Sequence, residues 1–138
     1  MKPMTVMIML GVSALLVACA AGEKGPLELP AGTNEAAAKA NAMGIAHYKL
    51  GEDEYGHWYT AKDYFEDAIK AEPQRAEPHF NLALTLDKLG EHAEATAEFK
   101  KAAASSPGSA AITRSEAYRK HVVSSPGSGK DSGYGGGY

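Results

Sequence analysis

Five histidines are the residues of this 138-residue chain best suited to hold a metal ion or transfer a proton. No two of them lie three or four positions apart on one predicted helix, which is the spacing that helical metal sites use. A zinc site would therefore have to be assembled across helices. We expect surface or groove residues here, and we assign no metal and no cofactor. The histidines are His47, His57, His79, His92 and His121.

Carboxylates gather at residues 52–54 and again at Asp63, Glu66 and Asp67. Paired carboxylates perform acid–base catalysis where burial or neighbouring charges shift their pKa. The first group lies in a predicted loop that lacks the ligand spacing of calcium loops, and the second lies on a predicted helical face beside Lys62. We interpret both as solvated groups. No nucleophile elbow, phosphate-binding loop or dinucleotide motif occurs, so the sequence does not indicate an enzyme.

The single cysteine, Cys19, ends an apolar N-terminal stretch. Lys2 gives this stretch a positive start, and its apolar centre, residues 6–17, is shorter than the roughly 20 residues of a membrane-spanning helix. A short apolar run of this kind, ending in small residues, is typical of a secretory signal that is later removed. Residues 1–18 are therefore predicted to be a signal peptide.

Residues 16–19, Leu-Val-Ala-Cys, resemble the lipobox of bacterial lipoproteins. The resemblance implies cleavage before Cys19, a diacylglycerol on its sulfur and acylation of the new amino terminus. Two or more acyl chains anchor a protein stably to a membrane. Because Ala20 is not acidic, the resemblance also implies transfer to the outer membrane. The alternative is an ordinary signal peptide in which Cys19 is only a small residue.

The charge balance argues against nucleic acid as a partner. The chain has 14 basic and 17 acidic residues, a net charge of −3, and no run of basic residues. Binding to nucleic acid depends chiefly on clustered lysine and arginine, which neutralise phosphates. We therefore expect no nucleic-acid partner.

Glycine and proline divide the rest of the chain into segments. Residues 19–33 are rich in both and are predicted to be a lipidated tether. Residues 124–138 are rich in glycine and serine and are predicted to be a disordered tail. Between them we predict five helices, because helix breakers such as Gly51, Pro73 and Gly90 follow helix-forming runs. The helices span residues 35–50, 58–71, 76–89, 92–105 and 109–123.

The chain also repeats itself with a period of 34 residues. The second and fourth predicted helices carry the same residues at matching positions, and both are followed by proline. A repeat of this kind cannot bury its apolar face alone, so neighbouring repeats must stack. The matching residues are Ala61, Phe65, Ala68 and Pro73, which correspond to Ala95, Phe99, Ala102 and Pro107.

This period and pattern resemble the tetratricopeptide repeat. Residues 76–109 carry the closer resemblance, since Leu82-Ala83 supply its hydrophobic and small pair and Lys88-Leu89-Gly90 its turn. The resemblance implies an all-α fold, an α–α superhelix with disordered ends. It comprises two repeats, residues 34–75 and 76–109, and a capping helix over residues 110–123. The alternative is a generic bundle of helical hairpins.

In the tetratricopeptide family the first helix of each repeat lines a concave groove that takes an extended peptide or a helix. Carried over by position, partner-binding residues come from both first helices. They are Asn41, Ile45, Tyr48 and Lys49 from the first repeat, and Glu77, Phe80, Asn81, Leu84, Asp87 and Lys88 from the second. A second candidate surface contains Tyr55, Trp58 and Tyr59, since aromatic residues often anchor partners.

Together these features predict a non-enzymatic adaptor of the bacterial cell envelope. We expect it to be lipid-anchored at the periplasmic face of the outer membrane and to bind another envelope protein. Solenoids generally need three or more repeats, so the outer side of the first repeat should be covered by a second copy or by a partner. The alternative is a small-ligand or metal-binding lipoprotein that uses the histidines and the acidic loop.

Overall fold

The computed structural model describes residues 25–124. The predicted signal peptide over residues 1–18, the predicted lipidation site Cys19 and the predicted tail beyond residue 124 lie outside the described residues. Within the described range no helix is both long enough and apolar enough to cross a membrane.

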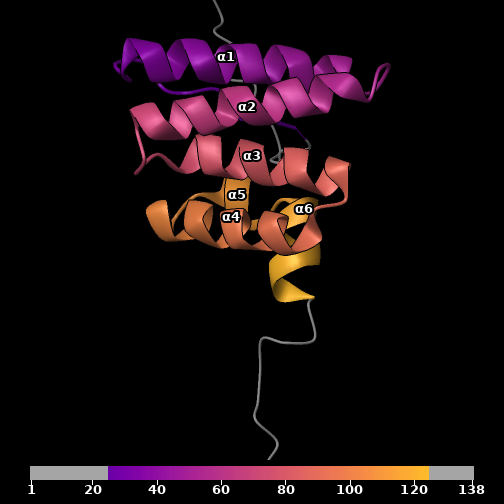
Figure 1. Cartoon of the computed structure of the whole chain (residues 1–138). Coiled ribbons are helices and arrows are strands. Elements are labelled where there is room, and N and C mark those ends of the chain that lie inside the picture. Colours follow the sequence, from indigo (N-terminus) through magenta and orange to yellow (C-terminus); the bar gives the residue numbers. More distant parts are fainter. Residues whose placement is uncertain (1–24, 125–138) are drawn as a thin grey trace, which may run out of the picture.

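Four helices form a stack in which each packs against the next along the chain (Figure 1). They are α1 (Glu35–Leu50), α2 (Gly56–Ala71), α3 (Ala76–Leu89) and α4 (His92–Ser105). Residues 25–124 contain no strand. The predicted all-α class and the stack of helical pairs are confirmed.

Local capping fixes the helix ends. The Asn34 side chain accepts the main-chain N–H groups of Ala36 and Ala37 at 2.9 and 3.2 Å, which starts α1. Gly90 ends α3 with a φ of 81°, a conformation that favours glycine. Helix α2 starts two residues before the predicted position, because the N–H of His57 already donates to the main chain of the preceding loop.

The period of 34 residues is visible in backbone geometry. Glu72 ends α2 with φ and ψ of −140° and 82°, and Ser106 ends α4 with −142° and 75°. The matching alanines and phenylalanines of α2 and α4 all have no exposed surface. Equivalent residues thus adopt the same conformation in the same environment, as two stacked repeats require.

Aromatic side chains fill the space that small residues leave open. A Cβ atom added at Gly44 on α1 would lie 2.5 Å from Cε1 of Phe65, so α1 and α2 approach too closely for alanine. One repeat further on, Phe99 meets Phe80 edge to face, with 5.6 Å between ring centroids. Phe99 also meets Tyr118 of the C-terminal segment at 6.2 Å. Phe99 therefore joins the second repeat to its cap.

The prediction of one capping helix is wrong in detail. The segment forms α5 (Ala110–Thr113), α6 (Glu116–Tyr118) and a π-helical turn, η1 (Arg119–Val123). The buried Ser115 causes the break, because its hydroxyl donates to the Ile112 carbonyl at 2.8 Å and accepts the Tyr118 N–H at 3.2 Å. The segment still covers the second repeat, and its outer residues are exposed. Those residues are Arg114, Glu116, Arg119 and Lys120.

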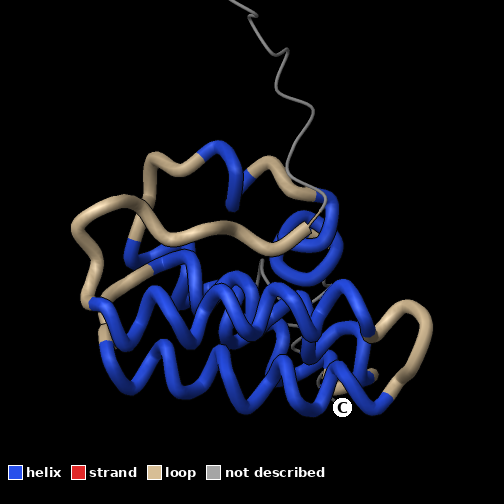
Figure 2. The backbone as a smooth tube through the Cα atoms, turned by 90° about the horizontal axis from the view of Figure 1, so that it is seen from above, coloured by secondary structure: helices blue, strands red, loops and turns tan. Residues whose placement is uncertain are grey.

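The predicted tether over residues 19–33 is also wrong for its described part. Residues 25–33 run along the helices as an extended segment (Figure 2). The Leu27 side chain packs against the core, and the Asn34 N–H donates to Glu72 at 2.8 Å. Because Leu27 lies beside Asn41 while Asn34 lies at the start of α1, the segment runs antiparallel to α1. We call residues 25–30 the N-terminal strap.

Candidate functional site

Two asparagines on neighbouring first helices bind the main chain of the N-terminal strap. Asn41 lies on α1 and Asn81 on α3, and both are fully buried. The Leu27 N–H donates to Oδ1 of Asn81 at 2.6 Å. The Leu27 carbonyl accepts from Nδ2 of Asn41 at 3.0 Å and from Nδ2 of Asn81 at 2.8 Å. We call Asn41 and Asn81 the asparagine clamp.

The asparagine clamp reads backbone and not side chains. It satisfies both polar main-chain groups of one residue, and Nδ2 of Asn81 also donates to Oδ1 of Asn41 at 2.8 Å. No buried side-chain nitrogen or oxygen among residues 25–124 lacks a hydrogen-bond partner. Main-chain hydrogen bonds give affinity for an extended chain of any sequence. This face of α1 and α3 is therefore built to hold extended backbone.

Beyond the asparagine clamp the same face opens into a cavity of about 280 Å³. Seven residues separate Asn41 from Tyr48 and Asn81 from Lys88, so the cavity lies about 10 Å along both helices. The C-terminal cap supplies its opposite wall. The lining residues are Tyr48, Leu84, Asp87, Lys88, Glu116, Ala117 and Lys120. We call this space the groove cavity.

Charge and aromatic contacts set the polarity of the groove cavity. Lys88 is held by Glu52 at 2.6 Å, and its Nζ lies 5.4 Å from the Trp58 ring centroid. Burial, together with the negative charges of Glu52 and Asp87, raises the pKa of Tyr48 to about 12. The Tyr48 phenol therefore stays protonated at neutral pH and keeps its hydrogen to donate.

The comparisons with known proteins bear on this face. A family model described as the tetratricopeptide repeat matches residues 76–109, which contain α3, α4 and the turn after them. Residues 76–109 are a tetratricopeptide repeat. No curated protein and no solved structure matches the chain. Tetratricopeptide repeats typically bind proteins and are non-catalytic, so this is a protein-interaction module.

The groove residues predicted from the tetratricopeptide resemblance fall into three groups. Asn41 and Asn81 form the asparagine clamp on Leu27. Four others line the groove cavity. These four are Tyr48, Leu84, Asp87 and Lys88.

The third group does not reach the groove cavity. Phe80 is fully buried against Phe99, and Ile45 is buried in the same core, so neither offers a surface to a partner. We correct the prediction for these two residues. Lys49 is exposed and Glu77 half-buried, and both lie outside the groove cavity lining.

The aromatic loop beside the tetratricopeptide groove divides in the same way. Tyr55 and Tyr59 are 50% and 53% exposed and meet edge to face. Trp58 packs against the core, and its Nε1 donates to the Tyr48 carbonyl at 3.2 Å. Trp58 thus supports the groove, and the two tyrosines form the exposed part of the loop.

Sequence reasoning missed one cluster. Asp87, His92 and His121 each place one donor atom within 4.8 Å of the other two. His121 is 5% exposed and His79 7%, so the expectation of surface or groove histidines is wrong for both. The repeat itself held the missing signal. His121 follows Asp87 by one period of 34 residues, and equivalent positions of successive repeats lie side by side.

Proposed function

We propose that this protein is a membrane-anchored adaptor of the bacterial cell envelope, whose tetratricopeptide groove binds an extended segment of another envelope protein. The observation that carries the proposal is the asparagine clamp on Leu27. It recognises main-chain groups alone, and the chain itself supplies an extended segment as occupant. A face that holds one extended peptide through its backbone can accept another.

The groove cavity is the part of this face that the N-terminal strap leaves open. Its length of about 10 Å accommodates about three extended residues, at roughly 3.3 Å each. Leu84 offers an apolar contact, and the Tyr48 phenol offers a hydrogen-bond donor. Asp87 and Lys88 add one charge of each sign. The groove cavity therefore suits a short peptide with a central apolar residue flanked by polar ones.

The lipobox at residues 16–19 supports the membrane anchor. Since the N-terminal strap lies against the helices, only residues 20–24 separate it from the lipidated Cys19. Five residues span at most about 18 Å when fully extended. The module is therefore held close to the bilayer surface, where anchoring raises its effective concentration toward other anchored proteins. Replacement of Cys19 by serine should move the protein from the membrane fraction to the soluble fraction.

Site-specific photo-crosslinking tests the adaptor function. A photoreactive amino acid replaces Lys88 in the groove cavity or, as a matched control, Lys100 on the exposed side of α4. In intact envelopes the Lys88 position should give a discrete crosslinked partner that the Lys100 position does not give. Leu84→Glu should abolish that product. Identical products from both positions, or none from Lys88, would contradict the proposal.

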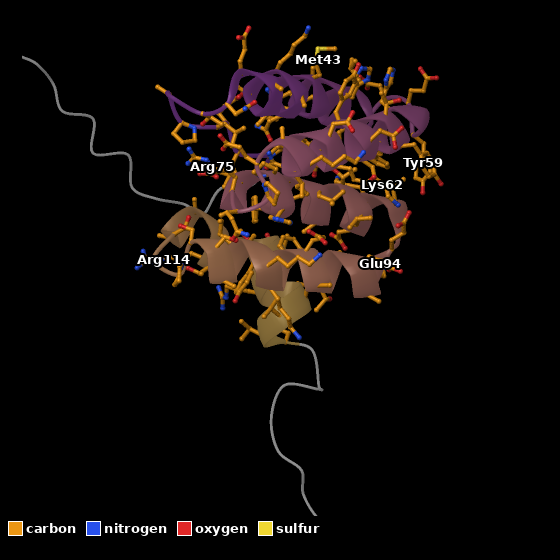
Figure 3. All side chains as sticks on the ribbon, turned by 60° about the vertical axis from the view of Figure 1, so that its left-hand side comes forward. Met43, Tyr59, Lys62, Arg75, Glu94 and Arg114 are labelled. Atoms are coloured by element: carbon orange, nitrogen blue, oxygen red, sulfur yellow. The ribbon has the colours of Figure 1, made fainter. Side chains whose placement is uncertain are left out.

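We also propose that a second copy covers the outer side of the first repeat. The outer face of α1 carries small residues with Met43, which is 39% exposed and lies at the end of the stack (Figure 3). A shallow cavity there brings together Lys39 and Asp67. In a twofold dimer, Lys39 of each copy can face Asp67 of the other. Sedimentation should show a dimer that Met43→Glu dissociates, and a strict monomer would contradict this pairing.

A further inference from the structure

Three elements meet at the far side of the groove cavity and bring two histidines to one carboxylate. Oδ1 of Asp87, on α3, lies 2.7 Å from Nε2 of His121 on η1. The same oxygen lies 3.1 Å from Nδ1 of His92, the first residue of α4. The two imidazole rings lie 5.5 Å apart and are tilted by 32°. All three donor atoms therefore surround one small volume.

The surroundings hold the histidine and the carboxylate in the state that a metal ion requires. Nδ1 of His121 lies 3.4 Å from the Thr96 hydroxyl, which itself donates to the His92 carbonyl at 2.8 Å. The hydroxyl oxygen can therefore accept the Nδ1 hydrogen, which leaves Nε2 with a free lone pair toward Asp87. The His121 ring also stacks on Phe99 with centroids 5.5 Å apart, so its orientation is fixed.

Asp87 is ionised under ordinary conditions. Burial by itself would raise its pKa, but the hydrogen bond from His121 and the charges of His121, Lys120 and His92 outweigh burial and lower the pKa. Nζ of Lys120 lies 3.7 Å from the carboxylate, and its side chain is 66% exposed. Lys120 can therefore turn into solvent when a cation takes its place.

We propose that Asp87, His92 and His121 bind a divalent transition-metal ion, with Zn²⁺ as the best match. Two imidazole nitrogens and one carboxylate oxygen are a common three-ligand set for zinc, with water as the fourth ligand. Zinc–ligand bonds of about 2.0–2.1 Å in a tetrahedron place neighbouring donor atoms about 3.3 Å apart. The observed 2.7 and 3.1 Å require only a small opening of the cluster.

Binding at this site would tie three elements together. The ion would link α3 and α4, which form the tetratricopeptide repeat, to η1 of the cap. Asp87 also lines the groove cavity, so the ion would fix one wall of the peptide-binding face. The inference nevertheless stands on the three ligands and does not depend on the peptide function.

Calorimetric titration of the mature chain, stripped with chelator, with zinc sulfate tests the proposal. Wild type should bind one ion per chain at micromolar concentration, and its unfolding temperature should rise in zinc. His92→Ala should weaken binding at least about tenfold, the size of effect seen when a metal site loses support. Because the His92 side chain is 61% exposed, this variant should keep its fold, which circular dichroism checks.

Two matched variants make the titration specific. His57→Ala removes a histidine from the opposite end of the groove and should leave zinc affinity unchanged. Lys120→Ala removes the competing cation and should leave affinity unchanged or increase it. Cobalt in place of zinc should give the visible absorption of a tetrahedral nitrogen–oxygen site in wild type and not in His92→Ala. No saturable binding by wild type, or equal binding by His92→Ala, would overturn the proposal.

Discussion

His79 is a buried residue whose two ring nitrogens both face acceptors. Nδ1 lies 2.6 Å from Oε2 of Glu98, and Nε2 lies 3.0 Å from the Pro73 carbonyl oxygen. Only the doubly protonated imidazolium can donate to both. The hydrogen bond to Glu98 accordingly raises the pKa of His79. Burial alone would raise the pKa of Glu98, but hydrogen bonds from His79 and Lys101 outweigh burial and lower it.

This pair predicts a pH dependence of stability. The pKa of His79 is raised in the folded protein, so its contribution is complete below the ordinary value near 6.5 and disappears as pH rises through the folded value. Glu98→Gln should lower the free energy of unfolding by about 2 kcal/mol at pH 6 and much less at pH 9. Urea unfolding across this range should show the wild-type and variant curves converging. Parallel curves would contradict the assignment.

At this scale the sequence predicted residue identities better than residue partners. The tetratricopeptide resemblance placed Asn41 and Asn81 in the groove, and the structure puts both on its binding face. Their occupant, Leu27, lies 54 residues before Asn81 and belongs to no periodic pattern. Its proline- and glycine-rich surroundings resemble a linker. Only the three-dimensional fold shows that this segment lies in the groove.

Among the helices, the close approach of α1 to α2 depends on Gly44. In a helix interior alanine is ordinarily better than glycine by about 1 kcal/mol. Here the added methyl group would lie 2.5 Å from Phe65, whose ring is fully buried and cannot move away. Overpacking of this kind costs about 1–3 kcal/mol. The balance therefore favours glycine.

The prediction is that Gly44→Ala lowers the free energy of unfolding by about 1–2 kcal/mol. Gly56→Ala is the control, because Gly56 also lies in a helix and nothing lies within 4 Å of an added Cβ. That variant should be neutral or slightly stabilising. Chemical denaturation of both variants under one condition provides the comparison. Equal stability of both variants would show that the contact with Phe65 is not limiting.

The bounds of α1, α3 and α4 match the prediction because strong stop signals follow them in the sequence. The C-terminal segment does not match. Its residues 110–123 satisfy helical periodicity, yet Ser115 forms local hydrogen bonds to Ile112 and Tyr118 that restart the helix. Periodicity reports which face is buried, and it does not report a side chain that competes for the backbone.

For the whole molecule, two repeats are stable together because both open faces receive cover. The cap closes the second repeat at the end of the stack (Figure 1). The N-terminal strap crosses the first helices and supplies Leu27 to their apolar face. The sequence predicted the cap and left the strap out. The protein therefore has a peptide-binding face that is half occupied by its own chain.

The most direct measurement of that claim adds the N-terminal strap back as a separate peptide. A chain beginning at Asn34, shown to be folded by circular dichroism, is titrated with a fluorescent peptide of residues 25–33. The peptide should bind saturably and reverse the loss of the strap. Asn81→Ala should weaken binding by about tenfold, since one buried hydrogen-bonded group contributes about 1–3 kcal/mol. Equal binding of this variant, or of a scrambled peptide, would contradict the account.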